Sequence, residues 1–309
     1  MKKVLVTSYE NPDLDGTACS VGYAEYLQKQ GKDAVAGVFG SLHRETEFVL
    51  QAGNIPSPVS AEELINNNTE IILVDASDTT GIAKQINLQK VIEVIDHRKI
   101  HFASEFINAK IQIELVGSAA TLIAEKYFDK DVAISKESAL LLYAAIVSNT
   151  INFQATVTTD RDKKMAEWLK TKCEIPENFA HDMFVAKSRF IEPLEAVFEH
   201  DFSLIPLNDN KLGIVQLEIV EADNFIEQNM AEIQRILLRI REEKTLDMIL
   251  LTIIDVEKAT NDFIATDPIT QQLMQRALDV IFIGDRSHRE GILMRKQITP
   301  LLKETIGKV

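Results

Sequence analysis

The sequence predicts an α/β protein, with a doubly wound parallel sheet in the N-terminal domain and a smaller mixed α+β domain after it. In the first half of the chain, short and continuous apolar runs alternate with helical stretches, which is typical of a parallel sheet covered on both faces. This alternation changes after the polar segment 187–195. At 309 residues the chain also exceeds the size at which one hydrophobic core usually stops growing, so two domains are expected.

The first domain is predicted to contain four strands and five helices. Gly31 is a stop signal for the first helix, and the run Thr158-Thr159-Asp160 is a cap signal for the last one. Because the connections of such a sheet are right-handed, the carboxyl ends of its strands meet at one edge. The strands are expected at 4–7, 34–38, 71–74 and 91–95, and the helices at 17–29, 44–51, 118–128, 136–148 and 160–171.

The second domain is expected to be a mixed sheet with one long helix at 229–243. That helix carries an apolar stripe formed by Ile233, Ile236, Leu237 and Ile240. The predicted boundaries are therefore a first domain at 1–186, a linker at 187–195 and a second domain at 196–309. The strands of the second domain are expected at 212–217, 248–254, 262–265, 280–283 and 291–294.

The composition restricts the classes of partner and compartment. The net charge of −14, from 33 basic and 47 acidic residues, disfavours a protein that coats duplex nucleic acid, but it allows a small phosphorylated substrate in a locally basic or metal-containing cleft. Cys19 and Cys173 are too few for a disulfide framework or a thiolate zinc site, which indicates a reducing compartment. With no apolar run long enough to cross a bilayer, a cytoplasmic protein without a membrane partner is expected.

Acidic residues and one histidine follow three of the predicted strands, where open α/β sheets bind their ligands. Asp13 and Asp15 follow the first strand, Asp75 follows the third, and His97 follows the fourth. Taken singly, each has a structural explanation, because aspartates serve in turns and helix caps and histidines serve in hydrogen-bonded cores. Together they offer carboxylate oxygens and one imidazole, which suit manganese or magnesium. The conjunction favours a metal site at this edge.

These segments resemble the motifs of the DHH phosphoesterase superfamily, and within it those of the manganese-dependent family II inorganic pyrophosphatases. The resemblance rests on the turn at 11–15, on Asp75 after an apolar run, and on Val94-Ile95-Asp96-His97. Also similar are the chain length, the helix starts at 116–121 and at Thr159-Asp160, and the segment Arg295-Lys296-Gln297, which is expected as a strand. The likeness spans nearly the whole chain and implies an active site in the cleft between the domains.

In that family two manganese ions are held by two histidines and four aspartates, and a bridging water is the nucleophile. Two of these positions differ here, since Tyr9 replaces a histidine and Asn149 replaces an aspartate. Tyrosine, with a reference pKa of about 10, is a poor ligand at neutral pH, and Asn149 offers only an uncharged carbonyl. One or two ions of Mn²⁺, or else of Mg²⁺ or Co²⁺, are therefore expected. The resemblance implies metal ligation by Asp13, Asp15, Asp75, His97 and Asn149.

The resemblance also implies which residues contact the phosphates. Arg98 replaces the last histidine of the Asp-His-His signature and is followed by Lys99; a guanidinium still binds phosphate but is no proton donor near neutral pH. The second domain is expected to contribute Arg295 and Lys296, although a lysine of the family is missing near Ser203. The implied catalytic set is Asp15, Asp75, His97 and Arg98.

The sequence thus leads to three functional hypotheses. The first is a metal-dependent phosphohydrolase acting on pyrophosphate or a related small phosphoanhydride or phosphoester, with slowed or altered activity. The second is a catalytically lapsed relative that binds a phosphate compound or a nucleotide. The third is a phosphodiesterase for short oligonucleotides, which the acidic charge and the lack of a stacking stripe disfavour. A homodimer is compatible with the apolar face of Val21, Ala24 and Leu27, which suits a core equally well.

Overall fold

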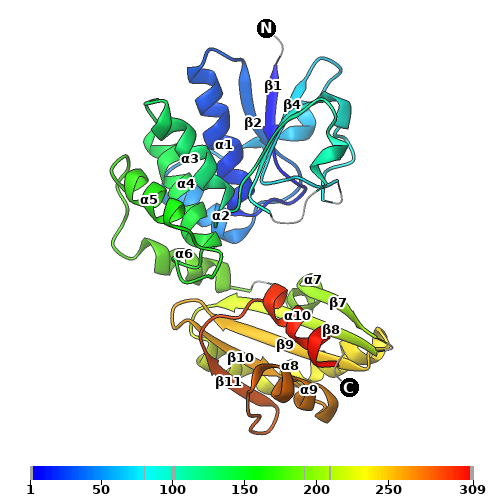
Figure 1. The fold of residues 1–309 in the computed structure, drawn as a ribbon. Coiled ribbons are helices and arrows are strands. Elements are labelled where there is room, and N and C mark those ends of the chain that lie inside the picture. Colours follow the sequence, from blue (N-terminus) through cyan, green and yellow to red (C-terminus); the bar gives the residue numbers. More distant parts are fainter. Residues whose placement is uncertain (1–2, 80, 99–101, 191, 209, 307–309) are drawn as a thin grey trace. The chain divides into compact units, whose positions relative to one another are not determined.

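The computed structural model describes residues 3–79, 81–98, 102–190, 192–208 and 210–306 (Figure 1). The chain divides into two compact units, Met1–Ala186 and Lys187–Val309, each with its own sheet. The predicted linker 187–195 contains the end of helix α6 (Phe179–Ser188) and the start of helix α7 (Leu194–His200).

The sheet of the first unit is parallel throughout, with the strand order β3-β2-β1-β4-β5-β6 that defines a doubly wound fold. The four predicted strands are confirmed to within one residue at each end. The two outermost strands are short or half polar, and the sequence pattern did not predict them. The strands are β1 (Val4–Thr7), β2 (Ala34–Val38), β3 (Val59–Ser60), β4 (Glu70–Val74), β5 (Val91–Asp96) and β6 (Lys110–Ile113).

Helices lie against one face of this sheet, where α1 packs on α3 and α4 (Figure 1). On the other face, Leu5, Ile71 and Leu73 are buried with Phe39 and Phe106, which lie in connecting segments. Full burial of such side chains stabilises the fold by about 1.5–3 kcal/mol each. The helices are α1 (Leu14–Lys29), α2 (Arg44–Ala52), α3 (Ala119–Asp129), α4 (Lys136–Asn149), α5 (Asp160–Lys170) and α6, with the 3-10 turns η1 (Ala61–Glu63), η2 (Leu88–Lys90) and η3 (Ala103–Glu105).

The second unit contains a mixed five-stranded sheet of order β11-β10-β9-β8-β7, in which only β8 and β9 run parallel. Two apolar cores form on its two faces. The stripe predicted on the long helix, for example Ile233 and Ile240, is fully buried in one core, and Met274 and Ile298 lie in the other. The elements are α7, β7 (Phe202–Leu207), β8 (Asn210–Ile219), α8 (Ala222–Glu243), β9 (Met248–Asp255), β10 (Thr260–Ile264), α9 (Pro268–Leu278), β11 (Arg286–Glu290) and α10 (Arg295–Ile306).

Three strand predictions for the second unit were wrong. Residues 280–283 form only an isolated bridge at Ile283, whose side chain is 85% exposed, and residues 291–294 are irregular. The segment Arg295-Lys296-Gln297 begins helix α10 and is not a strand. The strand that does form, β11, has the sequence Arg-Ser-His-Arg-Glu. Because an edge strand faces solvent, polar residues are favoured in it, and apolar periodicity does not detect it.

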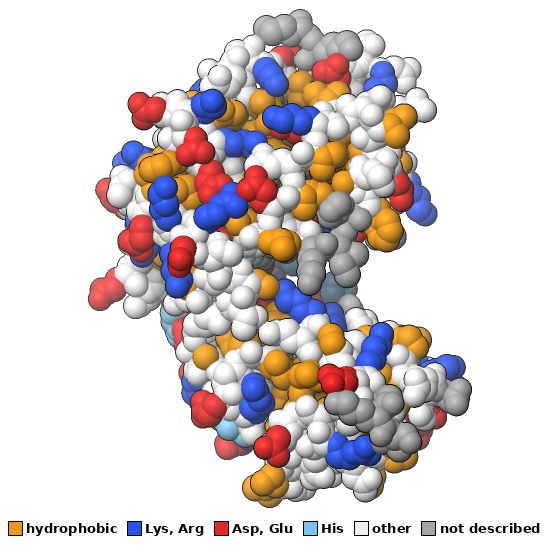
Figure 2. Space-filling model, in the orientation of Figure 1, with side chains coloured by type: hydrophobic (Ala, Val, Ile, Leu, Met, Phe, Trp, Pro, Cys, Tyr) orange, Lys and Arg blue, Asp and Glu red, His pale blue; other side chains and the backbone are white. Residues whose placement is uncertain are grey.

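Charges of both signs are mixed on the visible face of each unit, where Lys and Arg side chains are interspersed with Asp and Glu (Figure 2). This arrangement accords with a composition in which acidic residues exceed basic ones without forming a separate acidic tract. Over the described part of the chain, no helix combines the length and the apolar character that a membrane crossing requires.

Candidate metal centre

The topology of the first sheet brings three of the predicted site residues together. Asp15 lies just after β1, Asp75 follows β4, and His97 follows β5, and these three strands are neighbours in the sheet. One ligand atom from each of the three side chains lies within 4.8 Å of the other two. We call this group the Asp-Asp-His cluster. It lies beyond the carboxyl ends of the strands at the point where the strand order reverses, which is where open α/β sheets bind ligands.

Asp15 is held by the N-terminus of helix α3. Its carboxylate accepts hydrogen bonds from Ser118 Oγ at 2.9 Å, from the Ala119 amide at 2.8 Å and from the Ala120 amide at 2.9 Å. The free amides and the dipole at a helix N-terminus stabilise such a negative charge. Asn149 Nδ2 donates a further bond of 2.6 Å to Asp15 Oδ2. Asn149 therefore presents its side-chain amide nitrogen to Asp15. The sequence had led us to expect its carbonyl oxygen as a metal ligand, which stays a prediction.

Asp75 combines a strained backbone with an unsatisfied oxygen. Its φ of +52° is left-handed, a region that non-glycine residues seldom adopt and that is found at functional sites. The side chain is 2% exposed, and Oδ1 accepts no hydrogen bond from any residue in the described ranges. Burial raises the pKa of the Asp75 carboxyl to about 8, and the charge of Asp15 adds to the rise. A cation at this oxygen would remove both costs.

His97 is oriented toward the two carboxylates by a backbone carbonyl. Its Nδ1 lies 2.9 Å from Val116 O, while Nε2 lies 3.4 Å from Asp75 Oδ1 and 3.8 Å from Asp15 Oδ2. When Nδ1 donates its proton to the carbonyl, neutral His97 presents the lone pair of Nε2 to the cluster, as metal-ligating histidines do. Without an ion, burial opposes the imidazolium charge, but contact with Asp75 and the charge of Asp15 raise the pKa of His97 to about 10.

Asp96, the residue before His97, helps to hold the cluster in place through a hydrogen bond with the His97 backbone. Asp96 is fully buried, accepts a 2.7 Å hydrogen bond from the His97 amide and is also bonded by the hydroxyl of Ser77. Ala119 and Ala120 at the start of α3 have a similar supporting function toward Asp15. The motif Val116-Gly117-Ser118 was singled out from the sequence only by resemblance. This motif binds the carboxylate of Asp15 at the start of α3. A helix-start pattern in the sequence does not show which residue the helix start will bind.

The predicted metal ligation by Asp13 stays a prediction, and the structure shows a capping role for this residue. It caps helix α1, with Oδ1 accepting from the amides of Asp15 at 2.9 Å and Gly16 at 3.1 Å. Helix α1 begins at Leu14, three residues earlier than expected, because Asp13 and not Asp15 is the capping residue. The Asp-Asp-His cluster does not include Asp13. Its charge nevertheless acts on the cluster, since it contributes to the raised pKa of both Asp15 and Asp75.

Tyr9 and Arg98 also lie close to Asp75. The Tyr9 hydroxyl accepts a 3.2 Å hydrogen bond from the Asp13 amide, and burial raises the pKa of Tyr9 far above neutrality, so it is an uncharged phenol. The guanidinium of Arg98 lies 5.3 Å from the centre of the Tyr9 ring and donates to the Asp75 carbonyl oxygen at 2.9 Å. Lys99, predicted beside it, lies outside the described residues.

Of the two predicted phosphate ligands in the second unit, Arg295 is hydrogen-bonded within the unit and Lys296 is exposed. Arg295 Nη1 donates to the carbonyl oxygens of Asp201 at 2.6 Å and Ile214 at 3.4 Å, while Lys296 at the start of α10 is exposed. Ser203, where the resemblance led us to expect a nearby lysine, lies on β7 with its neighbours Phe202 and Leu204. The contribution of this unit to a site therefore stays a prediction.

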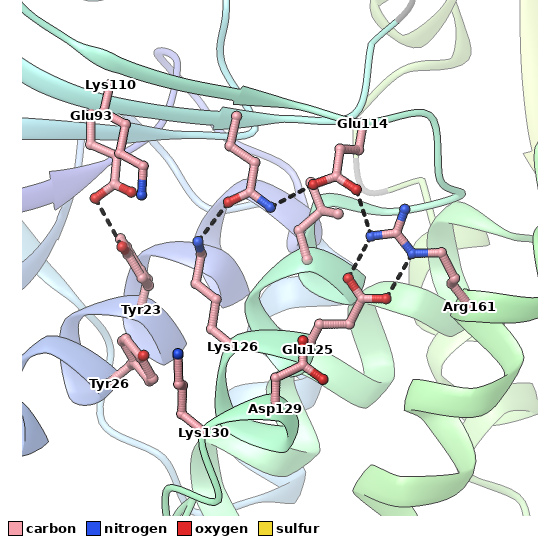
Figure 3. Close-up of a pocket in the computed structure, with 12 residues that line it drawn as sticks. Tyr23, Tyr26, Glu93, Lys110, Glu114, Glu125, Lys126, Asp129, Lys130 and Arg161 are labelled. Carbon is pink, nitrogen blue, oxygen red and sulfur yellow. Dashed lines mark hydrogen bonds and ion pairs between the residues drawn. The ribbon is translucent and has the colours of Figure 1, made fainter.

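A separate pocket of about 510 Å³ lies over helices α1 and α3 (Figure 3). Its lining carries charges of both signs: Arg161 pairs with Glu114 and Glu125, and Tyr23 donates to Glu93. None of the three residues of the Asp-Asp-His cluster lines it. The pocket thus has four acidic and four basic side chains, whereas the cluster contains a buried oxygen, Asp75 Oδ1, that accepts no hydrogen bond among the described residues.

Comparison with known proteins agrees with this geometry. The N-terminal domain of the DHH family matches residues 3–146. A probable manganese-dependent inorganic pyrophosphatase of Clostridium acetobutylicum is 30% identical over 309 residues, which is 99% of each chain. The manganese-dependent inorganic pyrophosphatase of Methanothrix thermoacetophila is 31% identical over 316 residues, again 99% of each chain.

A solved structure is similar over the same extent. The crystal structure of a Methanococcus jannaschii protein assigned to the family II inorganic pyrophosphatases has a TM-score of 0.72 and 28% identity, and the match covers 98% of this chain and 99% of that one. Sequence and fold therefore agree along both units and not only around the acidic motifs. The chain belongs to the family II inorganic pyrophosphatases of the DHH phosphoesterase superfamily.

Proposed function

We propose that this protein is a divalent-cation-dependent phosphohydrolase that acts on pyrophosphate or on a related small phosphoanhydride or phosphoester, with manganese as the preferred ion. The observation that carries the proposal is the buried Asp75 Oδ1, which accepts no hydrogen bond within the described structure and lies beside His97 and Asp15. The full-length relatives named as manganese-dependent inorganic pyrophosphatases support the choice of ion and substrate.

The ion would be held by Asp15, Asp75 and His97. Two carboxylates and an imidazole suit a hard or borderline divalent cation. When bound, such a cation supplies charge neutralisation for a phosphoryl group and lowers the pKa of water. The remaining contributions come from the chain itself. The start of α3 fixes Asp15, the Val116 carbonyl fixes the tautomer of His97, and the left-handed backbone of Asp75 directs its carboxylate into the cluster.

Arg98 is the residue that we propose to contact the substrate. Its side chain is 36% exposed, so part of the guanidinium is accessible while Nη2 donates to the Asp75 carbonyl oxygen. A guanidinium binds two phosphoryl oxygens in a fixed geometry and keeps its charge at every physiological pH. Lys99, Arg295 and Lys296 are proposed as further phosphate ligands. Because a guanidinium keeps its proton near neutral pH, Arg98 does not assist departure of the leaving phosphate as an acid.

The proposed activity is slow compared with that of relatives with a complete set of ligands. Tyr9 is an uncharged phenol, and Asn149 donates to Asp15 and carries no charge that would hold an ion. We expect that Tyr9→His together with Asn149→Asp increases phosphate release from pyrophosphate. The test is phosphate release from pyrophosphate, tripolyphosphate and a dinucleotide in Mn²⁺, Co²⁺ and Mg²⁺. Absence of release from all three substrates in every metal, before and after the double substitution, would refute the proposal.

A second candidate function is phosphate sensing without turnover. It is favoured by the five donors around Asp15, which satisfy that carboxylate without an ion: Ser118, Ala119, Ala120, Asn149 and the thiol of Cys19. Calorimetric titration with pyrophosphate distinguishes the two functions. Tight binding with no phosphate release, also in the double variant, supports the sensor. In either case the proposed partner is a small phosphorylated molecule, and the two unpaired thiols support a reducing, cytoplasmic compartment.

A further inference from the structure

Arg98 is surrounded by acidic groups next to the Asp-Asp-His cluster. Besides its bond to the Asp75 carbonyl, Nη2 lies 3.8 Å from Asp75 Oδ1, Nε lies 3.7 Å from Asp96 Oδ2, and Nη1 lies 3.9 Å from Asp78 Oδ2. The ring of Tyr9 lies 5.3 Å from the guanidinium carbon. The positive charge of Arg98 is therefore a fixed part of the site.

The same oxygen of Asp75 lies near two cationic groups. Its Oδ1 lies 3.4 Å from His97 Nε2 and 3.8 Å from Arg98 Nη2. His97 and Asp15 complete the Asp-Asp-His cluster around this carboxylate. Arg98 is a permanent cation next to the same carboxylate. A second divalent ion at Asp75 would be repelled both by the first ion and by this guanidinium at short range.

Among the described residues, the other side chains near Arg98 and Tyr9 do not form a second group of three carboxylate, imidazole or thiol ligands. Asp13 uses Oδ1 to cap α1, and the Tyr9 hydroxyl accepts a hydrogen bond from the Asp13 amide. A neutral phenol is a poor ligand, and a divalent cation needs several oxygen or nitrogen ligands at short range. A second manganese, as the family resemblance implied, does not fit these described residues.

We infer that Arg98 stands in for the second metal ion, so that the chain binds one divalent ion at the Asp-Asp-His cluster and orients the phosphoryl group with a built-in guanidinium. This inference rests on the proposed function, because it assigns the substrate contact of the same site. A guanidinium differs from a metal ion in two ways: it carries a single charge, and it donates hydrogen bonds in a plane. It binds and orients a phosphoryl group but does not activate water.

The test is the number of manganese ions that each chain binds. After equilibrium dialysis against excess Mn²⁺, elemental analysis of the full chain should give about one ion per chain, and electron paramagnetic resonance should show an isolated Mn²⁺ spectrum. The Tyr9→His/Arg98→His variant should bind about two ions and show the spectrum of a spin-coupled pair. Two ions or a coupled spectrum in the unaltered protein would overturn the inference, and so would a double variant that stays at one ion with native circular dichroism.

A second set of variants tests Arg98 without rebuilding the site. Arg98→Gln should keep one manganese per chain but bind inorganic phosphate roughly tenfold more weakly in calorimetry, as loss of a charge-assisted contact predicts. Arg98→Lys, which keeps the charge and loses the planar fork, should lie between the two. Equal phosphate affinity in all three proteins would contradict the assignment of Arg98 as the phosphate ligand.

These measurements separate the inference from the proposed function. One bound ion with no hydrolysis of any substrate would support the inferred role of Arg98 and contradict the proposed phosphohydrolase activity. Two bound ions with hydrolysis would sustain the phosphohydrolase and would refute the role of Arg98. The count of ions does not depend on turnover, so each proposal can fail alone.

Discussion

A buried aspartate in each unit shows two opposite ways of placing a negative charge inside a protein. In the second unit, Asp262 on β10 is 1% exposed, accepts a 2.7 Å hydrogen bond from Arg286 Nε and lies 3.2 Å from His288 Nδ1. In the first unit, Asp75 is 2% exposed, but its Oδ1 accepts no hydrogen bond among the described residues and other carboxylates lie close by. The fold binds the first carboxylate through hydrogen bonds, whereas the cationic groups near the second, His97 and Arg98, lie at 3.4 and 3.8 Å from Oδ1 and leave that oxygen available to a metal ion.

This difference separates an architectural charge from a functional one. A buried ion pair that is broken is costly, because the remaining partner is left uncompensated. A buried carboxylate that accepts no hydrogen bond lowers the stability of the folded protein. It is retained where it serves a function such as binding an ion. Five changes test the comparison, and the largest effect is expected at Asp75.

Asp75→Asn should abolish high-affinity manganese binding. The change removes the charge and one oxygen from the Asp-Asp-His cluster, so the loss should exceed the roughly 10–100-fold that removal of a supporting partner causes. Calorimetry with Mn²⁺ measures it, with Asp33→Asn on the exposed surface as the matched control. An unchanged affinity in Asp75→Asn would remove the metal centre from this place.

Asp262→Ala should destabilise the second unit and leave metal binding intact. The guanidinium of Arg286 would lose its buried partner and keep Asp223, at a cost of about 1.5–3 kcal/mol in the free energy of unfolding. Trp168 is the only tryptophan and lies in the first unit, so its fluorescence follows that unit while circular dichroism follows both. Reduced manganese affinity in this variant would show that Asp262 is more than architectural.

The stability of the ion-free protein should fall as pH rises from about 6.5 to 9. The pKa of Asp75 is raised to about 8 and that of His97 to about 10, so in the folded state both groups hold protons that the unfolded chain releases at lower pH. Each raised group stabilises the fold below its unfolded pKa and loses that contribution as pH rises through its folded pKa. The slope is at most about 1.4 kcal/mol per pH unit for each group.

Manganese should reverse this dependence on pH. Binding needs a deprotonated Asp75 and a neutral His97, so the ion displaces protons and its affinity increases with pH. Thermal unfolding at pH 6.5 and 9, with and without Mn²⁺, measures both effects. A stabilisation by Mn²⁺ that is equal at the two pH values would contradict the raised pKa values.

Asp13→Asn should have the smallest effect. Asparagine is as good a helix cap as aspartate, so we expect a change of only a few tenths of a kcal/mol, whereas Asp13→Ala should cost about 1 kcal/mol. Manganese affinity should stay within about threefold in Asp13→Asn, because the charge is lost outside the Asp-Asp-His cluster. A collapse of manganese affinity would restore Asp13 to the ligands that the sequence predicted.

The sequence was sufficient for the parts of the site that depend on sheet topology. Apolar runs located β1, β4 and β5, and their order made Asp15, Asp75 and His97 meet. It was insufficient where a contact decides between two uses of one residue type. The sequence pointed to Asp15 as the possible cap of a helix beginning at Thr17, and only the observed start of α1 at Leu14 assigns the cap to Asp13.

The other differences between the predictions and the structure come from a polar edge strand and from the hydrogen-bonding partner of one side chain. Strand β11 contains no apolar run, so the prediction selected the neighbouring segments 280–283 and 291–294. The amide of Asn149 could present either its oxygen or its nitrogen, and the carboxylate of Asp15 at 2.6 Å selects the nitrogen. Such outcomes depend on charges that come from segments far apart in the chain.

The left-handed backbone at position 75 restricts how this site can evolve. At a φ of +52°, asparagine, aspartate and glycine are tolerated, whereas β-branched side chains clash with their own backbone. A lineage that gives up the ion is therefore expected to pass through Asn or Gly at this position, and a single further base change can bring the acid back. Ancestral reconstruction and saturation mutagenesis at position 75 would reveal whether the lost chemistry is this easily recovered.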